Sequence, residues 1–522
     1  MLYKSKIQGW DKISFFIVIS MLCAIGIFYF YSAGQNTIVG FIADDAKYLL
    51  MTDFFSPYYS LLSKSAAFIM QSTQFPPLYP FLLAILGASS ENLLLAHILT
   101  TSFFLGALVI FVIWIYEDGV NMLTGACLSL IIICSPASLF MNLDLWSEHL
   151  FLLFTMCALY LIEKARKNYK YWLVALLFIS SLPLIRVTGV AFLLAFFVYL
   201  YINKIPHRFI YMAISAIPII VWKIFTTSNS PRGVYENILS NFYEGDIRPI
   251  VEELFLGQLP NLWIGWHQCF DIQRNLESGL VAACVLALAS VTWALRLKNK
   301  RLDSLYVMFY LILMWLWPSI DSDLRYIFVV MPILVYYSCL SLFLILETYT
   351  KESFKKLVCY ASIIFVLITF LPTDLYALNK FFTQVSPELK RYRSTKYWLT
   401  QPSSFEMDNS VLILNKVTQS YKEAKQYIPE GECAYSVHYE EFMFHSRRLA
   451  FPLPLPGRVE KDNFVKEIGR CEYIHINNTN SHPYVPVAYP IELLGGNFDY
   501  LMLTRMTDAA ESPIVGALVK MH

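Results

Sequence analysis

The sequence predicts a mainly α-helical protein, a polytopic bundle of membrane helices followed by a small C-terminal α/β domain. Three observations support this fold class. The 522 residues are 57% hydrophobic and only 15% charged, which leaves too little polar surface to cover a soluble globule of this size. Apolar stretches long enough to cross a bilayer recur through residues 1–373. Charged residues are concentrated at the other end, with 33 in the last 149 residues and 46 in the first 373.

These observations divide the chain into two predicted regions. Residues 1–373 form a membrane domain with two long outer loops, 32–78 and 228–277, and residues 374–522 form the C-terminal domain. Eleven stretches qualify as membrane helices, because about 20 apolar helical residues cross a hydrocarbon core about 30 Å thick. They lie near 13–31, 93–116, 122–141, 146–162, 172–185, 187–202, 209–226, 278–297, 305–318, 324–346 and 357–371.

The basic residues predict the orientation of these helices. With a cytoplasmic N-terminus, sixteen Lys and Arg fall in the inner loops and seven in the longer outer loops, as the positive-inside rule requires. Eleven crossings then place the C-terminal domain on the exoplasmic face. We therefore expect a multi-pass protein of the inner or plasma membrane with an exoplasmic C-terminal domain.

The outer loops and the C-terminal domain also show local patterns. Residues 57–71 predict an amphipathic helix that rests on the membrane surface, and residues 250–259 repeat this pattern more weakly. In the C-terminal domain, residues 412–428 are helix-like, and 433–437, 472–476 and 500–504 are strand candidates. An oxidising compartment would allow Cys433 and Cys471 to pair, but their spacing alone leaves pairing and free thiols equally open.

Several classes of function have no support in the sequence. The net charge of +1 is spread without a long basic arm, so no nucleic-acid partner is expected. The ten cysteines show no metal-binding spacing, and neither a phosphate-binding glycine loop nor a serine-hydrolase elbow occurs.

An acidic pair follows the first predicted membrane helix. Asp44 and Asp45 stand side by side, with Lys47 close behind. Adjacent carboxylates raise each other's proton affinity and move one of them toward general-base strength. The alternative interpretation is an acidic helix cap, which the pair alone favours. A divalent ion at Asp44 and Asp45 is an open hypothesis, because no third clear ligand accompanies them.

Further charged residues stand at the outer ends of later predicted helices. Glu148 lies at the start of the fourth, Arg186 separates the fifth from the sixth, and Arg325 opens the tenth. A carboxylate at the membrane edge is often functional, although one near the surface can be solvated. Two arginines at this depth could hold a phosphate by bidentate hydrogen bonds, or each could extend to the lipid headgroups.

The order of these residues resembles the GT-C superfamily, polytopic glycosyltransferases that use polyprenyl-phosphate sugars. The matching segments are Asp44, Asp45, Lys47 and Tyr48; Pro76, Pro77, Leu78 and Tyr79; Ser147 and Glu148 before Leu150 and Phe151; and Arg325 and Tyr326 before Pro332. The chain has Gln74 and Phe75 where the aminoarabinose transferases of the superfamily place a lysine before two prolines. This departure argues against a lipid A specificity.

The resemblance implies that residues 1–373 are the transferase domain. It implies that Asp44, with Asp45 beside it, accepts the proton of an acceptor hydroxyl while that oxygen displaces the donor phosphate with inversion. Further expected roles are donor-phosphate binding by Lys47, Arg186, Arg325 and Tyr326, and substrate positioning by Glu148 and Tyr79. The expected partners are a polyprenyl-phosphate-linked sugar, a glycan, lipid or protein acceptor, and the bilayer, and no cofactor is required.

Two other classes of function remain open at this point. A transporter or flippase would be expected to show repeats or charged helix breaks near the bilayer midplane, and a glycan polymerase or ligase would place its key loop late in the chain. The transferase hypothesis makes a geometric demand instead. The acidic and cationic side chains must converge in one hollow at the outer membrane boundary.

Overall fold

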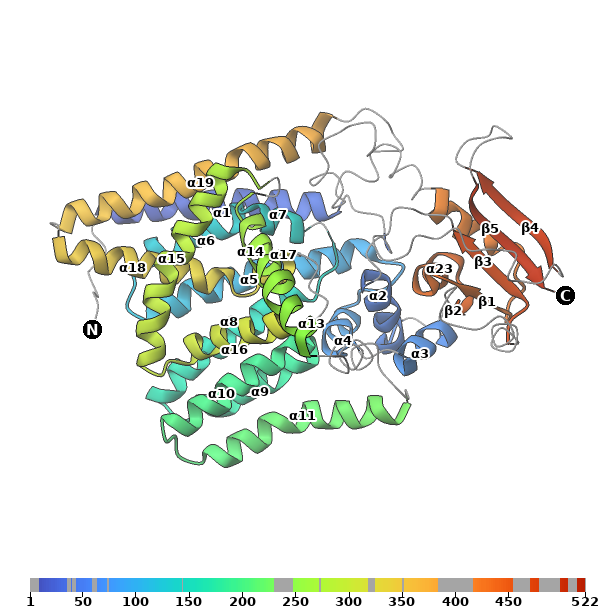
Figure 1. The fold of residues 1–522 in the computed structure, drawn as a ribbon, viewed down its shortest axis with the longest axis horizontal. Coiled ribbons are helices and arrows are strands. Elements are labelled where there is room, and N and C mark those ends of the chain that lie inside the picture. Colours follow the sequence, from blue (N-terminus) through green and yellow to red (C-terminus); the bar gives the residue numbers. More distant parts are fainter. Residues whose placement is uncertain are drawn as a thin grey trace.

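The computed structural model describes residues 9–34, 39, 44–58, 63–72, 75–142, 144–229, 247–271, 274–317, 324–349, 352–383, 416–453, 470–477, 498–505 and 514–521. A large helical part occupies one end of the long axis, and a small sheet occupies the other (Figure 1). The predicted fold class, a membrane-type helix bundle with a small C-terminal α/β unit, is confirmed.

The helical part is built from apolar helices, whose most extensive contacts join both consecutive helices and helices far apart in the sequence. Its helices are α1 (Gly9–Gly34), α5 (Leu93–Glu117), α6 (Met122–Cys134), α7 (Pro136–Met141), α8 (Glu148–Lys167), α9 (Tyr171–Ile185), α10 (Val190–Ile202), α11 (Arg208–Asn229), α15 (Leu276–Lys298), α16 (Leu302–Leu316), α17 (Leu324–Phe328), α18 (Met331–Tyr349) and α19 (Glu352–Thr383). Each of the eleven predicted stretches contains a helix.

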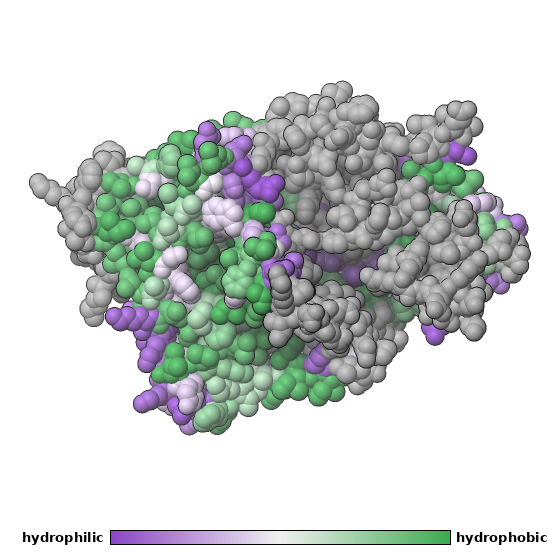
Figure 2. Space-filling view, in the orientation of Figure 1, coloured by the Kyte–Doolittle hydropathy of each residue, from purple (hydrophilic) through white to green (hydrophobic). Residues whose placement is uncertain are grey.

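The surface of this part is itself apolar. Among the described residues, four helical stretches are long and apolar enough to cross a membrane, namely Phe15–Ala33, Leu93–Glu117, Arg208–Thr226 and Leu276–Lys298, and six shorter apolar helices accompany them. Hydrophobic residues cover much of the helical part (Figure 2). On α11, Ile210, Ile217 and Val221 are each more than half exposed. Such a surface requires an apolar surrounding medium.

Two of the predicted stretches are broken by proline. Ser135 ends α6 and caps α7, where its hydroxyl accepts a hydrogen bond from the amide of Ser138 and Pro136 occupies the first helical position. The second break separates α17 from α18, which begins one residue before Pro332. Proline lacks an amide hydrogen and disfavours helix in the residue before it. The helix that carries Arg325 is therefore separate from the long helix that follows it.

The C-terminal domain is a mixed five-stranded sheet in the order β2-β1-β3-β5-β4. Its elements are β1 (Cys433–Ser436), α23 (Tyr439–Ser446), β2 (Leu449–Pro452), β3 (Tyr473–Asn477), β4 (Phe498–Arg505) and β5 (Ile514–Met521). β1 pairs in parallel with β2 and β3, and β5 pairs antiparallel with β3 and β4. The three predicted strands are present, residues 416–424 are helical as predicted, and β2, β5 and α23 were not predicted.

Two local features hold this domain together. Cys433 and Cys471 form a disulfide with their Cα atoms 5.2 Å apart, which decides the pairing that their spacing left open. Gly516 of β5 lies against the helix at 416–424, where a Cβ atom would stand 2.8 Å from Cβ of Ser420. Only glycine permits this close approach of helix and strand.

Three short helices connect the two parts. They are α2 (Asp44–Phe55), α3 (Ser63–Ser72) and α4 (Leu78–Ile85). The predicted amphipathic helix corresponds in part to α3, but the apolar side chains of Ala66 and Ile69 are buried inside the protein and do not lie on a membrane surface. Ile69 and Met70 are buried in a cluster with Phe442 and Met443 of the C-terminal domain. The correction follows from a neighbour that local periodicity cannot reveal, because any apolar surface satisfies an amphipathic helix.

The predicted pattern at 250–259 also forms helical turns. The chain runs through α13 (Ile247–Glu252), a π-helical segment (Glu253–Gln258) and α14 (Leu259–Gln268). Phe255 and Leu256 remain more than half exposed.

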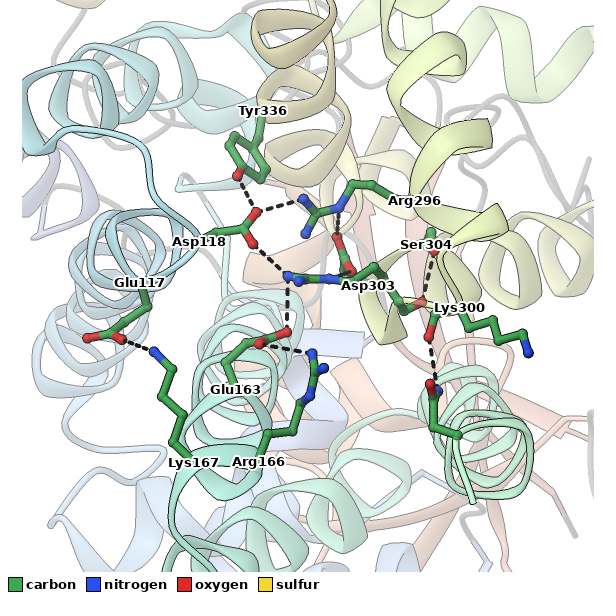
Figure 3. A network of polar contacts seen from close by, with 12 residues as sticks. Glu117, Asp118, Glu163, Arg166, Lys167, Arg296, Lys300, Asp303, Ser304 and Tyr336 are labelled. Carbon is green, nitrogen blue, oxygen red and sulfur yellow. Dashed lines mark hydrogen bonds and ion pairs between the residues drawn. The ribbon is translucent and has the colours of Figure 1, made fainter. Parts of the chain in front are cut away.

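A charged network closes one end of the helical part (Figure 3). Asp118 accepts hydrogen bonds from Arg296 and Arg301, each at 2.6 Å, and from the hydroxyl of Tyr336. Asp303 accepts from Arg296 at 2.6 Å and from Tyr337 at 2.7 Å. These contacts join the end of α5 to α15, α16 and α18. Buried charges persist only when they are paired and hydrogen-bonded in this way.

Candidate active site

A cavity of about 200 Å³ lies where α2, α16 and α17 meet the turn between α9 and α10. Its lining is Asp44, Tyr48, Phe75, Pro76, Arg186, Val187, Thr188, Val190, Leu313, Met314, Trp317, Arg325 and Tyr326. The charged members of this lining are one acid and two arginines. Apolar and aromatic side chains supply most of the rest of the lining. They keep the local dielectric constant low, which strengthens the electrostatic interactions of the charged groups.

Asp44 and Arg325 meet at this cavity from opposite ends of the helical part of the sequence. Asp44 is the first residue of α2, and its carboxylate accepts a hydrogen bond from Nη1 of Arg325 at 3.0 Å. The side chains are 23% and 16% exposed, respectively, so both are accessible from the cavity. The helix N-terminus also favours the negative charge of Asp44.

Aromatic rings fix the position of Arg325. Its guanidinium carbon lies 4.9 Å from the ring centroids of both Trp146 and Tyr326. Nη2 donates to the hydroxyl of Tyr326 at 2.9 Å, and the carbonyl of Tyr326 accepts from Tyr310. Contacts of this kind hold a cation without neutralising it. Tyr326, predicted at the phosphate site, lines the cavity beside Arg325.

Arg186 provides the second cation of the cavity. Helix α9 ends at Ile185, Arg186 is extended, and a 3₁₀ turn follows at Val187–Gly189. A Cβ at Gly189 would lie 2.4 Å from the carbonyl carbon of Leu182, so glycine is required for the turn to fold against α9. The turn thereby directs Arg186 into the cavity.

A chain of polar contacts supports Arg186 from behind. Its Nη1 lies 2.6 Å from Oε1 of Glu148, which is fully buried, and donates to the hydroxyl of Ser147 at 3.1 Å. The hydroxyls of Ser147 and Tyr48 are 2.9 Å apart. Nε of Arg186 is buried and makes no hydrogen bond within the described residues. Glu148 thus fixes Arg186 at the cavity while using only part of its set of N–H donors.

The other predicted site residues lie behind the cavity wall. The hydroxyl of Tyr79, a buried residue, is 2.8 Å from that of Thr100, and its ring packs edge-on against Tyr48, with the centroids 5.0 Å apart. Neither Tyr79 nor Glu148 is among the lining residues. Both therefore support residues that line the cavity.

Asp45 and Lys47 lie outside the cavity lining and face the C-terminal domain. Asp45 is buried, and its charge acts on Glu441. Nζ of Lys47 lies 3.0 Å from Oε1 of Glu440. Neighbouring positions on a helix point about 100° apart, so Asp44 and Asp45 do not share one surface. For Lys47 to bind a donor phosphate, its pair with Glu440 would have to open.

Comparisons with known proteins reveal a similarity of structure without one of sequence. No protein-family model and no curated protein sequence matches the chain. The structure matches the crystal structure of ArnT from Cupriavidus metallidurans bound to undecaprenyl phosphate, with a TM-score of 0.54 and 10% identity over 96% of this chain and 97% of that chain. It also matches apo ArnT, with a TM-score of 0.51 and 10% identity over the same shares.

The chain has the fold of ArnT. The predicted resemblance is thereby confirmed at the level of the fold. The match extends through the membrane-type bundle and the C-terminal domain, since it covers nearly all of both chains. At 10% identity the match shows the fold alone, so the roles of individual residues depend on the geometry of this chain.

The donor set of this cavity is better suited to an anion than to a metal ion. Among the described residues, no group of three or more His, Cys, Asp and Glu side chains could hold a metal ion. The carboxylate of Asp44 already pairs with Arg325, and Asp45 is not part of the cavity. Metal binding at Asp44 and Asp45 stays an open hypothesis that this arrangement does not favour.

Several residues of the cavity escaped prediction. Trp146, which packs on Arg325, begins one apolar stretch, and Trp317, which lines the cavity, lies near the end of another. Neither position carries a local signal of function. Ser147 was noted only as part of a motif, yet its hydroxyl lies between Tyr48 and Arg186. A sequence pattern could have drawn attention to Ser147 through its position directly before Glu148.

Proposed function

We propose that this protein is a membrane glycosyltransferase that moves a sugar from a polyprenyl-phosphate donor to a hydroxyl of a glycan, lipid or protein acceptor at the exoplasmic face. The observation that carries the proposal is the meeting of Asp44, Arg186 and Arg325 at one cavity. The GT-C fold supports it, and so does the undecaprenyl phosphate bound to ArnT, a protein of the same fold.

The two arginines suit the phosphate of the donor. Each guanidinium presents a planar fork of N–H donors that can bind a phosphate through two parallel hydrogen bonds. Two of the three charged lining residues are arginines, and Glu148, which pairs with Arg186, lies behind the lining, so an anion in the cavity can meet both guanidinium groups. In the transition state, negative charge grows on the departing phosphate, and fixed cations stabilise this charge.

Asp44 suits the role of general base. In the reaction, the acceptor hydroxyl gives its proton to Asp44 while its oxygen forms a bond to the anomeric carbon. The bond from that carbon to the phosphate oxygen breaks, and its electron pair leaves with the polyprenyl phosphate. Attack from the face opposite the phosphate inverts the configuration.

The pair between Asp44 and Arg325 gives this mechanism an order. A donor phosphate that binds Arg325 competes with the carboxylate of Asp44, 3.0 Å away. The carboxylate then turns to the acceptor hydroxyl, so the base becomes available once the donor is bound. The membrane keeps the donor head at the site, which lowers the entropic cost of the encounter.

Mass spectrometry of surface glycans and lipids tests the proposal. Cells with the wild-type protein are compared with cells that lack it and with cells that carry Asp44→Asn. Wild type should add one sugar to an acceptor, and Asp44→Asn should lower the rate roughly 10²–10⁴-fold while the protein still inserts into the membrane. Normal transfer by Asp44→Asn would remove Asp44 from the base role.

A further inference from the structure

The C-terminal domain contacts the helix that carries Asp44. Leu50 and Met51 of α2 are fully buried in one apolar cluster with Phe442 and Met443 of α23. Phe68 of α3 also packs edge-on against Phe451 of β2, with centroids 4.9 Å apart. The domain is therefore packed against the first outer loop and is more than a separate appendage.

An ion pair lies within this contact. Nζ of Lys47 is 3.0 Å from Oε1 of Glu440, and the side chains are 20% and 8% exposed. A pair so well shielded from water is screened little by salt and holds its partners in defined positions. Lys47 follows Asp44 by three residues, less than one turn of the same helix.

Lys47 also reaches the back of the cavity wall. Its Nζ lies 4.9 Å from the ring centroid of Phe75. That ring lines the cavity and packs edge-on against Tyr48, which also lines it. Glu440 is thus linked through Lys47 to two elements of the site, the start of α2 and the Phe75 segment.

Other contacts fix α23 against the same part of the chain. Arg447 ends α23 in a left-handed conformation with φ 58° and lies 2.7 Å from Glu91, while its Nη1 donates to Ser90 at 2.9 Å. The amide of Ser90 donates in turn to Asp53 of α2 at 2.8 Å. Nε2 of His445 is 2.8 Å from the carbonyl oxygen of Val39.

We propose that Glu440 of the C-terminal domain is a positioning residue of the transferase site, acting through Lys47 to hold the start of α2 and the Phe75 wall in place for reaction. This inference rests on the proposed function. It assigns the C-terminal domain a part in the reaction and gives Lys47 the role of a support in place of a phosphate ligand. A displacement of α2 by about 1 Å would move Asp44 out of line with the acceptor hydroxyl.

The test uses the full-length protein in membranes and a double-mutant cycle. Glu440→Gln, Lys47→Met and the double variant are compared with wild type for kcat at saturating donor and for the Kd of undecaprenyl phosphate, followed by tryptophan fluorescence. Glu472→Gln is the matched control, because Glu472 lies in the same domain, is 64% exposed and pairs with Lys520 at 3.4 Å. Thermal unfolding of each variant verifies that it is folded.

We expect Glu440→Gln and Lys47→Met each to lower kcat roughly tenfold, with Kd unchanged. The double variant should be no slower than the slower single variant, since both act through one contact. The proposal is overturned if Glu440→Gln matches Glu472→Gln, if the two losses multiply, or if Lys47→Met alone weakens undecaprenyl phosphate binding.

Asp44→Asn, measured in parallel, separates this inference from the proposed function. If Asp44→Asn is inactive and Glu440→Gln is fully active, only the positioning role fails. If Asp44→Asn transfers sugar normally, the proposed general-base mechanism fails, and the positioning role that rests on it fails as well.

Discussion

Two groups of charged residues, each with two arginines and two carboxylates, lie at opposite ends of α8 and use their charges differently. Glu148 of the first group begins the helix, and Glu163, which contacts the second group at Arg301, lies about 22 Å along it. The first group is Asp44, Glu148, Arg186 and Arg325, and the second is Asp118, Arg296, Arg301 and Asp303.

The difference lies in what the charges face. In the second group, Asp303 is 3% exposed and accepts a hydrogen bond from Arg296 (Figure 3). It also accepts one from Tyr337, so its charge is compensated within the protein. In the first group, Asp44 and Arg325 line a cavity. A closed network stabilises the fold, whereas an open one can exchange a protein partner for a ligand.

The sharpest test of this comparison removes one carboxylate charge from each group. Asp303→Asn should destabilise the folded protein by about 3–5 kcal/mol, because Arg296 and Arg301 would lose a buried counter-charge. Asp44→Asn should change stability by less than about 1 kcal/mol and abolish transfer. Denaturant unfolding in detergent micelles measures the first effect. Equal losses of stability in both variants would contradict the distinction.

A second test concerns the shape of a cation in the first group, the one that lines the cavity. Arg186→Lys keeps the charge but loses the planar fork, so the affinity for undecaprenyl phosphate should fall about tenfold, or about 1.4 kcal/mol. The thermal unfolding temperature should change little. Unchanged affinity would show that the cavity uses Arg186 only as a point charge. Leu177→Ala serves as the control, because Leu177 lies on α9, is 63% exposed and does not line the cavity.

A third test concerns Glu441, a buried carboxyl group whose neighbours include two other carboxylates. Burial, with the neighbouring Glu440 and Asp45, raises the pKa of Glu441 well above its usual range. The folded protein therefore keeps the proton of Glu441 above about pH 4.3, where the unfolded chain releases it. The free energy of unfolding consequently falls as the pH rises past that value. Glu441→Gln should raise the unfolding temperature at pH 7, and the difference should vanish below about pH 4. A difference in unfolding temperature that does not change with pH would contradict this prediction.

The smallest effect is expected at an exposed ion pair beside the second group. Lys167 is 62% exposed and pairs with Glu117 at 3.0 Å. Lys167→Ala should change the free energy of unfolding by less than about 1 kcal/mol, because exposed pairs contribute little. A larger loss would mean that the network near Glu117 extends its stabilisation to the surface.

The sequence predicted the helical bundle and the convergence of distant charges, but it could not predict the direction of every side chain. Apolar length identified the helices, and the predicted meeting of acidic and cationic side chains agrees with Asp44, Arg186 and Arg325, which line one cavity. It does not agree with Asp45 and Lys47, which lie outside the lining. Asp44 lines the cavity and Asp45 does not. This difference depends on how α2 is rotated about its axis. α2 packs not only on α3 and α4 but also, through Leu50 and Met51, on α23, which lies almost 400 residues further along the chain.

The missed strands have a similar explanation. β5 contains an uninterrupted apolar run with a glycine, which predicts a strand no better than a buried helix. β2 is four residues long and ends in Pro452. Its pairing with β1 is a long-range choice. The charged network of Figure 3 was likewise hidden, because each member looked like an ordinary residue flanking a membrane helix.

The contact between His445 and Val39 joins positions 406 residues apart, and it has a consequence for biosynthesis. During translation, the segment that contains Val39 and α2 emerges long before the domain that packs against it has been made. A nascent or prematurely terminated polypeptide therefore lacks the contacts that the C-terminal domain makes with α2. Completion of the chain thus precedes the final packing of the helix that carries Asp44.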